Sequence, residues 1–150
     1  MARRRRVTDV QRRRRVAPLL ERWRQRLQLN HWSVVYRFSS TLEHDGRPIF
    51  AEVNVTHPYK RAFMQFSRDC VDAAPAQELE HGVVHELCHL MLTDIKQKAI
   101  DNFGDGAIGD DFHQLIETAT DSIALAALTL WYRKPWAPYV DQNIIGGGKI

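Results

Sequence analysis

The stretch that decides the fold is PAQELEHGVVHELCHLML, residues 75–92. Its apolar residues recur at intervals of about three to four, the spacing that gives an α-helix one buried face. Pro75 suits the first position of such a helix, because that position needs no backbone N–H donor. The pattern therefore predicts a helix from Pro75 to about Leu92. The residues expected to face the core are Leu79, Val83, Val84, Leu87, Leu90 and Met91.

The same stretch contains His85, Glu86 and His89 in the order H-E-x-x-H. Residues four apart lie one above the other on a helix, so both imidazoles can bind one metal ion at about 2.1 Å. Glu86 lies one step, roughly 100°, around the helix. From there its carboxylate can accept a proton from a water that zinc has activated. The motif predicts a helical Zn²⁺ site with Glu86 as the general base.

A catalytic zinc site needs a third protein ligand and an open position. The sequence offers His81, His113 and Glu117. A straight helix rises about 12 Å from His81 to His89, so one ion cannot bind every histidine of the first helix. Asp121 follows Glu117 by four residues, so one carboxylate can bind zinc while the other holds a ligand histidine by its free ring N–H. We therefore predict Glu117 as the third ligand and Asp121 as the partner of a ligand histidine. His113 remains the alternative ligand or a donor to the transition state.

The rest of the chain predicts an α+β fold. Apolar residues at helical spacing over 16–29 predict an amphipathic N-terminal helix. Residues 96–110 are polar and rich in glycine, which predicts a loop before a second helix from Asp110 or Asp111 to Leu130. Short connections without crossover helices favour a small, mainly antiparallel sheet whose strands follow one another in chain order. Alternating apolar residues predict three strands, at 32–38, 49–55 and 62–66.

Charge is distributed unevenly along the chain. The net charge is +3, but residues 1–26 carry a net +9 and the remainder a net −6. Two arginine runs, Arg3–Arg6 and Arg12–Arg15, lie in the first part, and such runs repel themselves and stay solvated unless a polyanion is present. We predict three regions: a basic, disordered arm over 1–15, one catalytic domain over 16–133 and an irregular tail over 134–150.

Length and composition favour one globular domain. The chain has 150 residues, of which 44% are apolar, enough for a core of its own. Its longest apolar stretch, 123–131, is about half the roughly 20 residues that a membrane-spanning helix needs. Cys70 and Cys88 are expected to be free thiols, as is usual for a cysteine pair in a cytosolic chain. We therefore expect a soluble, cytoplasmic protein without a membrane partner.

The motif HELCH at 85–89, followed by ETATD at 117–121, resembles the gluzincin pattern. In that family H-E-x-x-H on one helix is completed by E-x-x-x-D on the next. The resemblance covers about residues 83–128 and implies a zincin-like fold and a peptidase activity. The site residues that it implies are His85, His89 and Glu117 as Zn²⁺ ligands, Glu86 as the general base, and Asp121 hydrogen-bonded to His85.

This small chain, with one helix and a short sheet expected before the active-site helix, is similar to compact metallopeptidases found in phage and bacterial genomes. No glycine follows His89 at the position typical of metzincins, which argues against that branch. We also expect no second large domain of the kind that builds a substrate cleft in larger gluzincins, so the resemblance leaves the substrate open. Tyr132 and Tyr139 join His113 as candidate donors to the transition state.

Two functions from different classes fit these patterns. The first is a zinc peptidase acting on an extended peptide or protein, which could pair with the edge of a strand at 62–66. The alternative is a nucleic-acid-associated zinc protein, with structural zinc or with DNA-bound protein substrates, that uses Arg3–Arg6 and Arg12–Arg15 to contact phosphates. A metal-binding module without activity and a hydrolase of non-peptide bonds are further alternatives.

Overall fold

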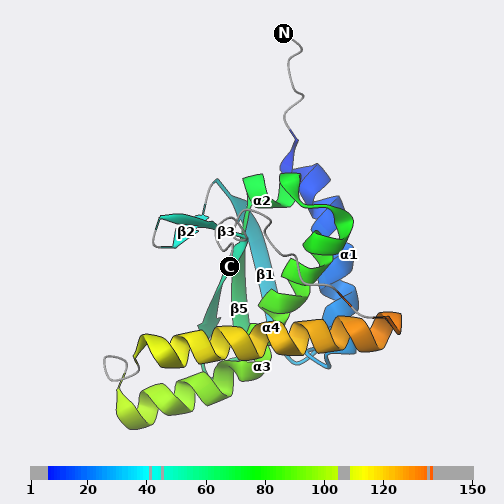
Figure 1. Cartoon of the computed structure of the whole chain (residues 1–150). Helices are drawn as coiled ribbons and strands as arrows, with labels where there is room; N and C mark the ends of the chain where they lie inside the picture. Colours follow the sequence, from blue (N-terminus) through cyan, green and yellow to red (C-terminus); the bar gives the residue numbers. More distant parts are fainter. Residues whose placement is uncertain (1–6, 41, 45, 105–108, 135, 137–150) are drawn as a thin grey trace, which may run out of the picture.

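The computed structural model describes residues 7–40, 42–44, 46–104, 109–134 and 136. The protein is α+β, with an N-terminal helix and two small sheets, as the sequence predicted at this coarse level. In chain order the elements are α1 (Asp9–Arg26), β1 (Ser33–Ser39), β2 (Leu42–His44), β3 (Arg47–Ile49), β4 (Ala51–Thr56), β5 (Arg61–Ser67), α2 (Arg68–Ala73), α3 (Ala76–Phe103) and α4 (Asp110–Tyr132) (Figure 1).

The larger sheet has the strand order β1-β5-β4, and β2 and β3 form a separate hairpin. β5 pairs in parallel with β1 and antiparallel with β4. The prediction of a mainly antiparallel sheet in chain order is therefore wrong for β1 and β5. β5 has more buried residues than either neighbour, which explains its central position. The alternation that predicted each strand reports which face is buried, but it does not report which strand lies alongside.

The edges of this sheet determine where an extended peptide could pair. Because β5 is paired on both sides, the prediction that residues 62–66 offer a free edge is wrong. Within the described residues, the outer strands of the sheet are β1 and β4. β4 lies against α3, and Phe50, immediately before β4, packs so closely on Gly82 that a Cβ there would lie 2.6 Å from the ring. The edge strand next to the histidine-bearing helix is therefore β4.

One face of the sheet forms a common core with the helices. The inward side chains include Phe38, Met64 and Phe66, and the ring of Phe66 contacts the rings of Tyr36, Phe38 and Phe50. They share one cluster of buried residues with α1 and α3. The residues that the helices contribute include Val16, Leu20 and Trp23 of α1 and Leu79, Val83, Val84, Leu87, Cys88 and Leu90 of α3.

Helix α1 begins earlier than the sequence predicted. Thr8 caps it through a reciprocal pair of hydrogen bonds with Gln11. Arg12 is buried, and its Nε donates to Oδ1 of Asp72 at 2.8 Å, while Arg15 donates to two backbone carbonyls at the end of α2. The expected disordered arm is therefore wrong for residues 9–15, which form the first part of α1 and in which Arg12 and Arg15 bind a carboxylate and two carbonyls of the domain. Arg3–Arg6 lie outside the described residues.

The two long helices differ from the prediction mainly at the connection between them. α3 continues to Phe103, about three turns beyond the predicted end, and stops at Gly104, whose φ of 77° suits glycine. The predicted loop is therefore wrong over 96–103. α4 begins at Asp110, at one of the two predicted positions, and ends at Tyr132. Of the predicted tail, Pro135 and residues 137–150 lie outside the described residues.

A buried carboxylate joins the three longest helices. Glu80 of α3 accepts hydrogen bonds from Nε1 of Trp23 at 2.6 Å, from Nη2 of Arg22 at 2.8 Å and from the hydroxyl of Tyr132 at 2.9 Å. Arg22 and Trp23 belong to α1, and Tyr132 is the last residue of α4. The guanidinium of Arg26 also stacks on the rings of Trp23 and Trp131. These contacts fix α1 and α4 relative to α3.

Candidate metal centre

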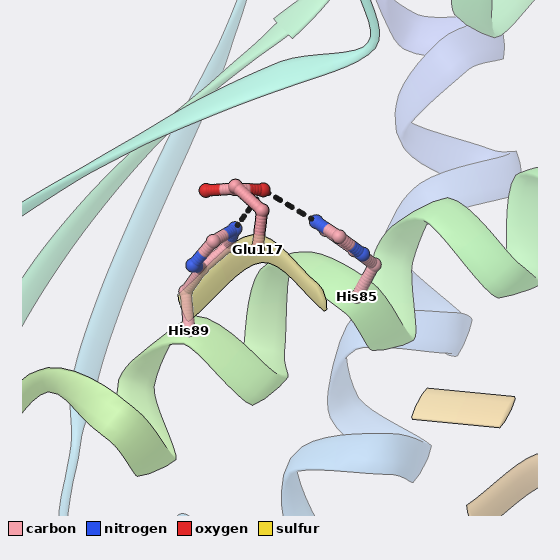
Figure 2. Close-up of side chains that lie close together, drawn as sticks. All are labelled: His85, His89 and Glu117. Atoms are coloured by element: carbon pink, nitrogen blue, oxygen red, sulfur yellow. Dashed lines mark ion pairs between the residues drawn. The ribbon is translucent and has the colours of Figure 1, made fainter. Parts of the chain in front are cut away.

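The candidate centre lies between α3 and α4, which run antiparallel and side by side (Figure 1). His85 and His89 project from α3 toward Glu117 of α4 (Figure 2). Nε2 of each histidine lies 3.5 Å from Oε2 of Glu117. One ligand atom from each of these three residues lies within 4.8 Å of the others. The group could therefore hold a metal ion, with two imidazole nitrogens and one carboxylate oxygen as donors.

The second ring nitrogen of each histidine faces an oxygen of α4. Nδ1 of His85 lies 3.5 Å from Oδ1 of Asp121, and Nδ1 of His89 lies 3.4 Å from Oγ1 of Thr120. Thr120 donates its hydroxyl hydrogen to the carbonyl of Ile116, so its oxygen is left to accept from the ring of His89. Both histidines can thus be held with Nε2 toward Glu117, which is how outer partners usually orient metal-binding imidazoles.

Thr120 is a site residue that sequence reasoning missed. It lies between the two acidic residues of ETATD, where a threonine carries no motif of its own. Its side chain is fully buried, which is unusual for a polar residue in a helix that is otherwise half exposed. The available signal was its position three residues after Glu117, which places it on the same face of α4.

Glu86 combines a buried position with nearby charge. It is 6% exposed, although it is an acid, and it is adjacent to His85 in the helix. Burial raises the pKa of the Glu86 carboxyl above its usual range, and the neighbouring His85 and His89 oppose this rise. A carboxyl in such an environment takes up a proton more readily than one in water. Glu86 therefore has the chemistry of a proton acceptor beside the candidate ligands.

The candidate ligands also affect one another's protonation. Hydrogen bonding to His85, and then to His89, holds the pKa of Glu117 well below its usual range. Burial is the largest single influence on the pKa of His85 and lowers it, but the carboxylates around the ring, Glu117 foremost, raise the pKa above its ordinary value. In the absence of a cation, the site therefore favours a proton on His85 and a negative charge on Glu117. A metal ion would replace that proton.

The other predicted candidates lie elsewhere or are already bonded. His113 is half-buried one turn before Glu117 on α4, and within the described residues it is outside the group of close ligand atoms. The hydroxyl of Tyr132 donates to Glu80, and Tyr139 lies outside the described residues. Cys88 is fully buried, and burial raises the pKa of its thiol to about 12, so it behaves as a core residue.

Comparison of the chain with protein-family models, with curated proteins and with solved structures found no match. A search of the described helices found none that combines the length and the apolar character needed to cross a membrane.

Proposed function

We propose that this protein is a zinc-dependent peptidase. The observation that carries the proposal is the convergence of His85 and His89 on Glu117, from two different helices, with Glu86 buried beside them. Two imidazoles and one carboxylate form a donor set that zinc uses in catalytic sites, where three protein ligands leave one position open. The absence of a thiolate among the donors also favours a catalytic over a structural zinc, since structural sites usually contain cysteine.

The residues around the three donors fit such an ion. Asp121 and Thr120 hold the ring nitrogens that would not bind it, so each histidine would need little rearrangement. A bound zinc ion supplies Lewis acidity, which lowers the pKa of water from about 16 toward about 7. Glu117 is 54% exposed, so the site is open to solvent on the side of α4. Water and substrate can therefore reach the donors.

In the proposed reaction Glu86 transfers the protons. Its carboxylate accepts a proton from the attacking water and later gives it to the nitrogen that leaves when the peptide C–N bond breaks. Water thus adds across the bond, the carbonyl carbon gaining the hydroxyl group and the leaving amine gaining the proton that Glu86 carried. The buried position of Glu86 favours this shuttle, because it brings the carboxyl pKa closer to neutral pH.

The substrate class that we propose is an extended peptide. β4 is an outer strand of the described sheet and lies against α3, so an extended chain could pair with its outer edge beside the helix that carries the histidines. In this proposal β4 takes the place of residues 62–66 as the strand that would pair with the peptide. The mode of recognition, addition of the peptide as a further strand, is the one expected from the sequence. By contrast, Arg12 and Arg15 are engaged within the domain, which removes half of the second arginine run from the support for nucleic-acid binding.

The test compares the wild type with Glu86→Gln, and uses Glu78→Gln, on the same helix, as the control. Zinc content and hydrolysis of unfolded casein are measured on the same samples. We expect Glu86→Gln to keep its zinc and to lose activity by at least about 100-fold, the usual contribution of a general base. Glu78→Gln should match the wild type. Zinc-loaded wild type without hydrolysis, or Glu86→Gln with wild-type hydrolysis, would refute the proposal.

A further inference from the structure

The candidate ligands belong to a longer series of alternating histidines and carboxylates. We call it the histidine–carboxylate ladder, and along it a residue of α3 alternates with one of α4. Each rung is an atom pair within 3.5 Å, and the shortest, at 3.1 Å, joins Nε2 of His81 to Oδ1 of Asp121. The ladder consists of His89, Glu117, His85, Asp121 and His81.

His81 lies at the end of the ladder that the three donors do not use. One ion cannot reach both His81 and His89, because about 12 Å of helix separates them. Its ring centroid is nevertheless 6.4 Å from that of His85, and Oδ1 of Asp121 lies between nitrogens of the two rings. Asp121 therefore faces two histidines with one oxygen, one of them a candidate ligand and the other not.

The carboxylate of Asp121 offers a hydrogen-bond acceptor to the Nε2 atom of His81. The atom is shielded from solvent and has no hydrogen-bond partner among the described residues, although Oδ1 of Asp121 lies only 3.1 Å away. A buried polar nitrogen without a partner is costly, and the oxygen facing it belongs to Asp121. The side chain of Asp121, by contrast, is 42% exposed and can rotate toward water. Contact with the less exposed His81, at 18%, restricts that rotation.

We propose that His81 is a positioning residue, which holds Asp121 against Nδ1 of His85 and thereby fixes the Nε2 atom of His85 toward Glu117. The inference rests on the metal site of the proposed function and extends it to a residue that binds no metal. Outer partners of this kind typically change metal affinity by about 10–100-fold. Because His81 acts through Asp121, we expect an effect near the lower end of that range.

The experiment measures Zn²⁺ affinity of the full chain by competition with a chromophoric chelator. We expect His81→Phe, which keeps the ring volume but removes both nitrogens, to weaken binding by about 10-fold. His81→Gln, whose amide nitrogen can replace Nε2 as a donor, should recover most of the loss. His31→Phe removes an exposed histidine of the α1–β1 connection and should leave the affinity unchanged. The melting temperature of the metal-free proteins shows that each variant is folded.

The same His81→Phe change, made in an Asp121→Ala variant, distinguishes an effect through Asp121 from a general packing effect of the His81 ring. In Asp121→Ala the carboxylate is absent, so a further His81→Phe change should have no effect on affinity if His81 acts through it. Wild-type affinity in His81→Phe, or an equal loss in both backgrounds, would overturn the inference while leaving the metal site intact. A wild type that binds no Zn²⁺ at all would instead overturn the proposed function, and the inference with it.

Discussion

Replacing Glu80 with alanine should strongly destabilise the fold, because this carboxylate connects three helices. Its side chain is 10% exposed and accepts hydrogen bonds from Trp23 and Tyr132, as well as from Arg22, which is 41% exposed. Hydrogen bonds to a charged group contribute about 1.5–3 kcal/mol each. The hydrogen bond from Arg22 adds little to the free energy of unfolding, since solvent screens it. The two shielded bonds give about 3–6 kcal/mol, and relief from burying the carboxylate offsets part of this.

The expected net loss for Glu80→Ala is therefore about 3 kcal/mol in the free energy of unfolding. For a chain of this length it corresponds to a fall of about 9 °C in melting temperature. Urea denaturation followed by tryptophan fluorescence measures it. Gln77→Ala, an exposed change on the same helix, is the control and should stay within about 0.5 kcal/mol of the wild type. A loss below about 1 kcal/mol for Glu80→Ala would refute the view that Glu80 joins the helices.

Two further predictions concern the start of α1 and the packing of α3 against Phe50. Hydrogen bonding to Arg68, and then to Arg12, lowers the pKa of Asp9 to about 2, so its contribution to stability is complete above about pH 4 and is lost as the pH falls toward 2. Asp9→Asn should therefore melt below the wild type at pH 6, and the difference in melting temperature should shrink below pH 4; a constant difference would contradict this. Gly82→Ala places a Cβ 2.6 Å from the ring of Phe50, so overpacking of about 1–3 kcal/mol should outweigh the gain of about 1 kcal/mol in helix propensity. Combining it with Phe50→Leu should restore stability measured by urea denaturation, and a Gly82→Ala variant as stable as the wild type would show that the ring yields without cost.

The helical part of the site could be predicted because its information is local. The spacing of His85 and His89 is a property of one helix, and the apolar residues that bury its other face lie in the same stretch. Glu117 and Asp121 follow the same rule on the next helix, and an antiparallel neighbour is the simplest arrangement that brings two such pairs together. The relative position of Thr120 follows from the same helix, but a threonine has too many ordinary roles to be selected from sequence.

The parts that could not be predicted depend on contacts between distant segments. The alternation in residues 62–66 revealed a strand but not that β1 would pair with its second edge. The arginines at 12 and 15 appear as a solvated run until Asp72 and the carbonyls at the end of α2 are placed beside them. α3 continues through residues 96–103, none of which is buried, so no buried apolar face marks this extension in the sequence.

Zinc analysis of the purified, dialysed protein tests most directly whether His85, His89 and Glu117 form a zinc site. It is measured for the wild type, for Glu117→Ala and for His113→Ala, which removes the alternative ligand on the same face of α4. The geometry predicts one zinc ion per chain in the wild type and in His113→Ala, and a large loss in Glu117→Ala, because Glu117 is the one acid among the described residues whose carboxylate lies within 3.5 Å of both histidines. Full zinc in Glu117→Ala together with its loss in His113→Ala would contradict the assignment, and a wild type without zinc would contradict the site itself.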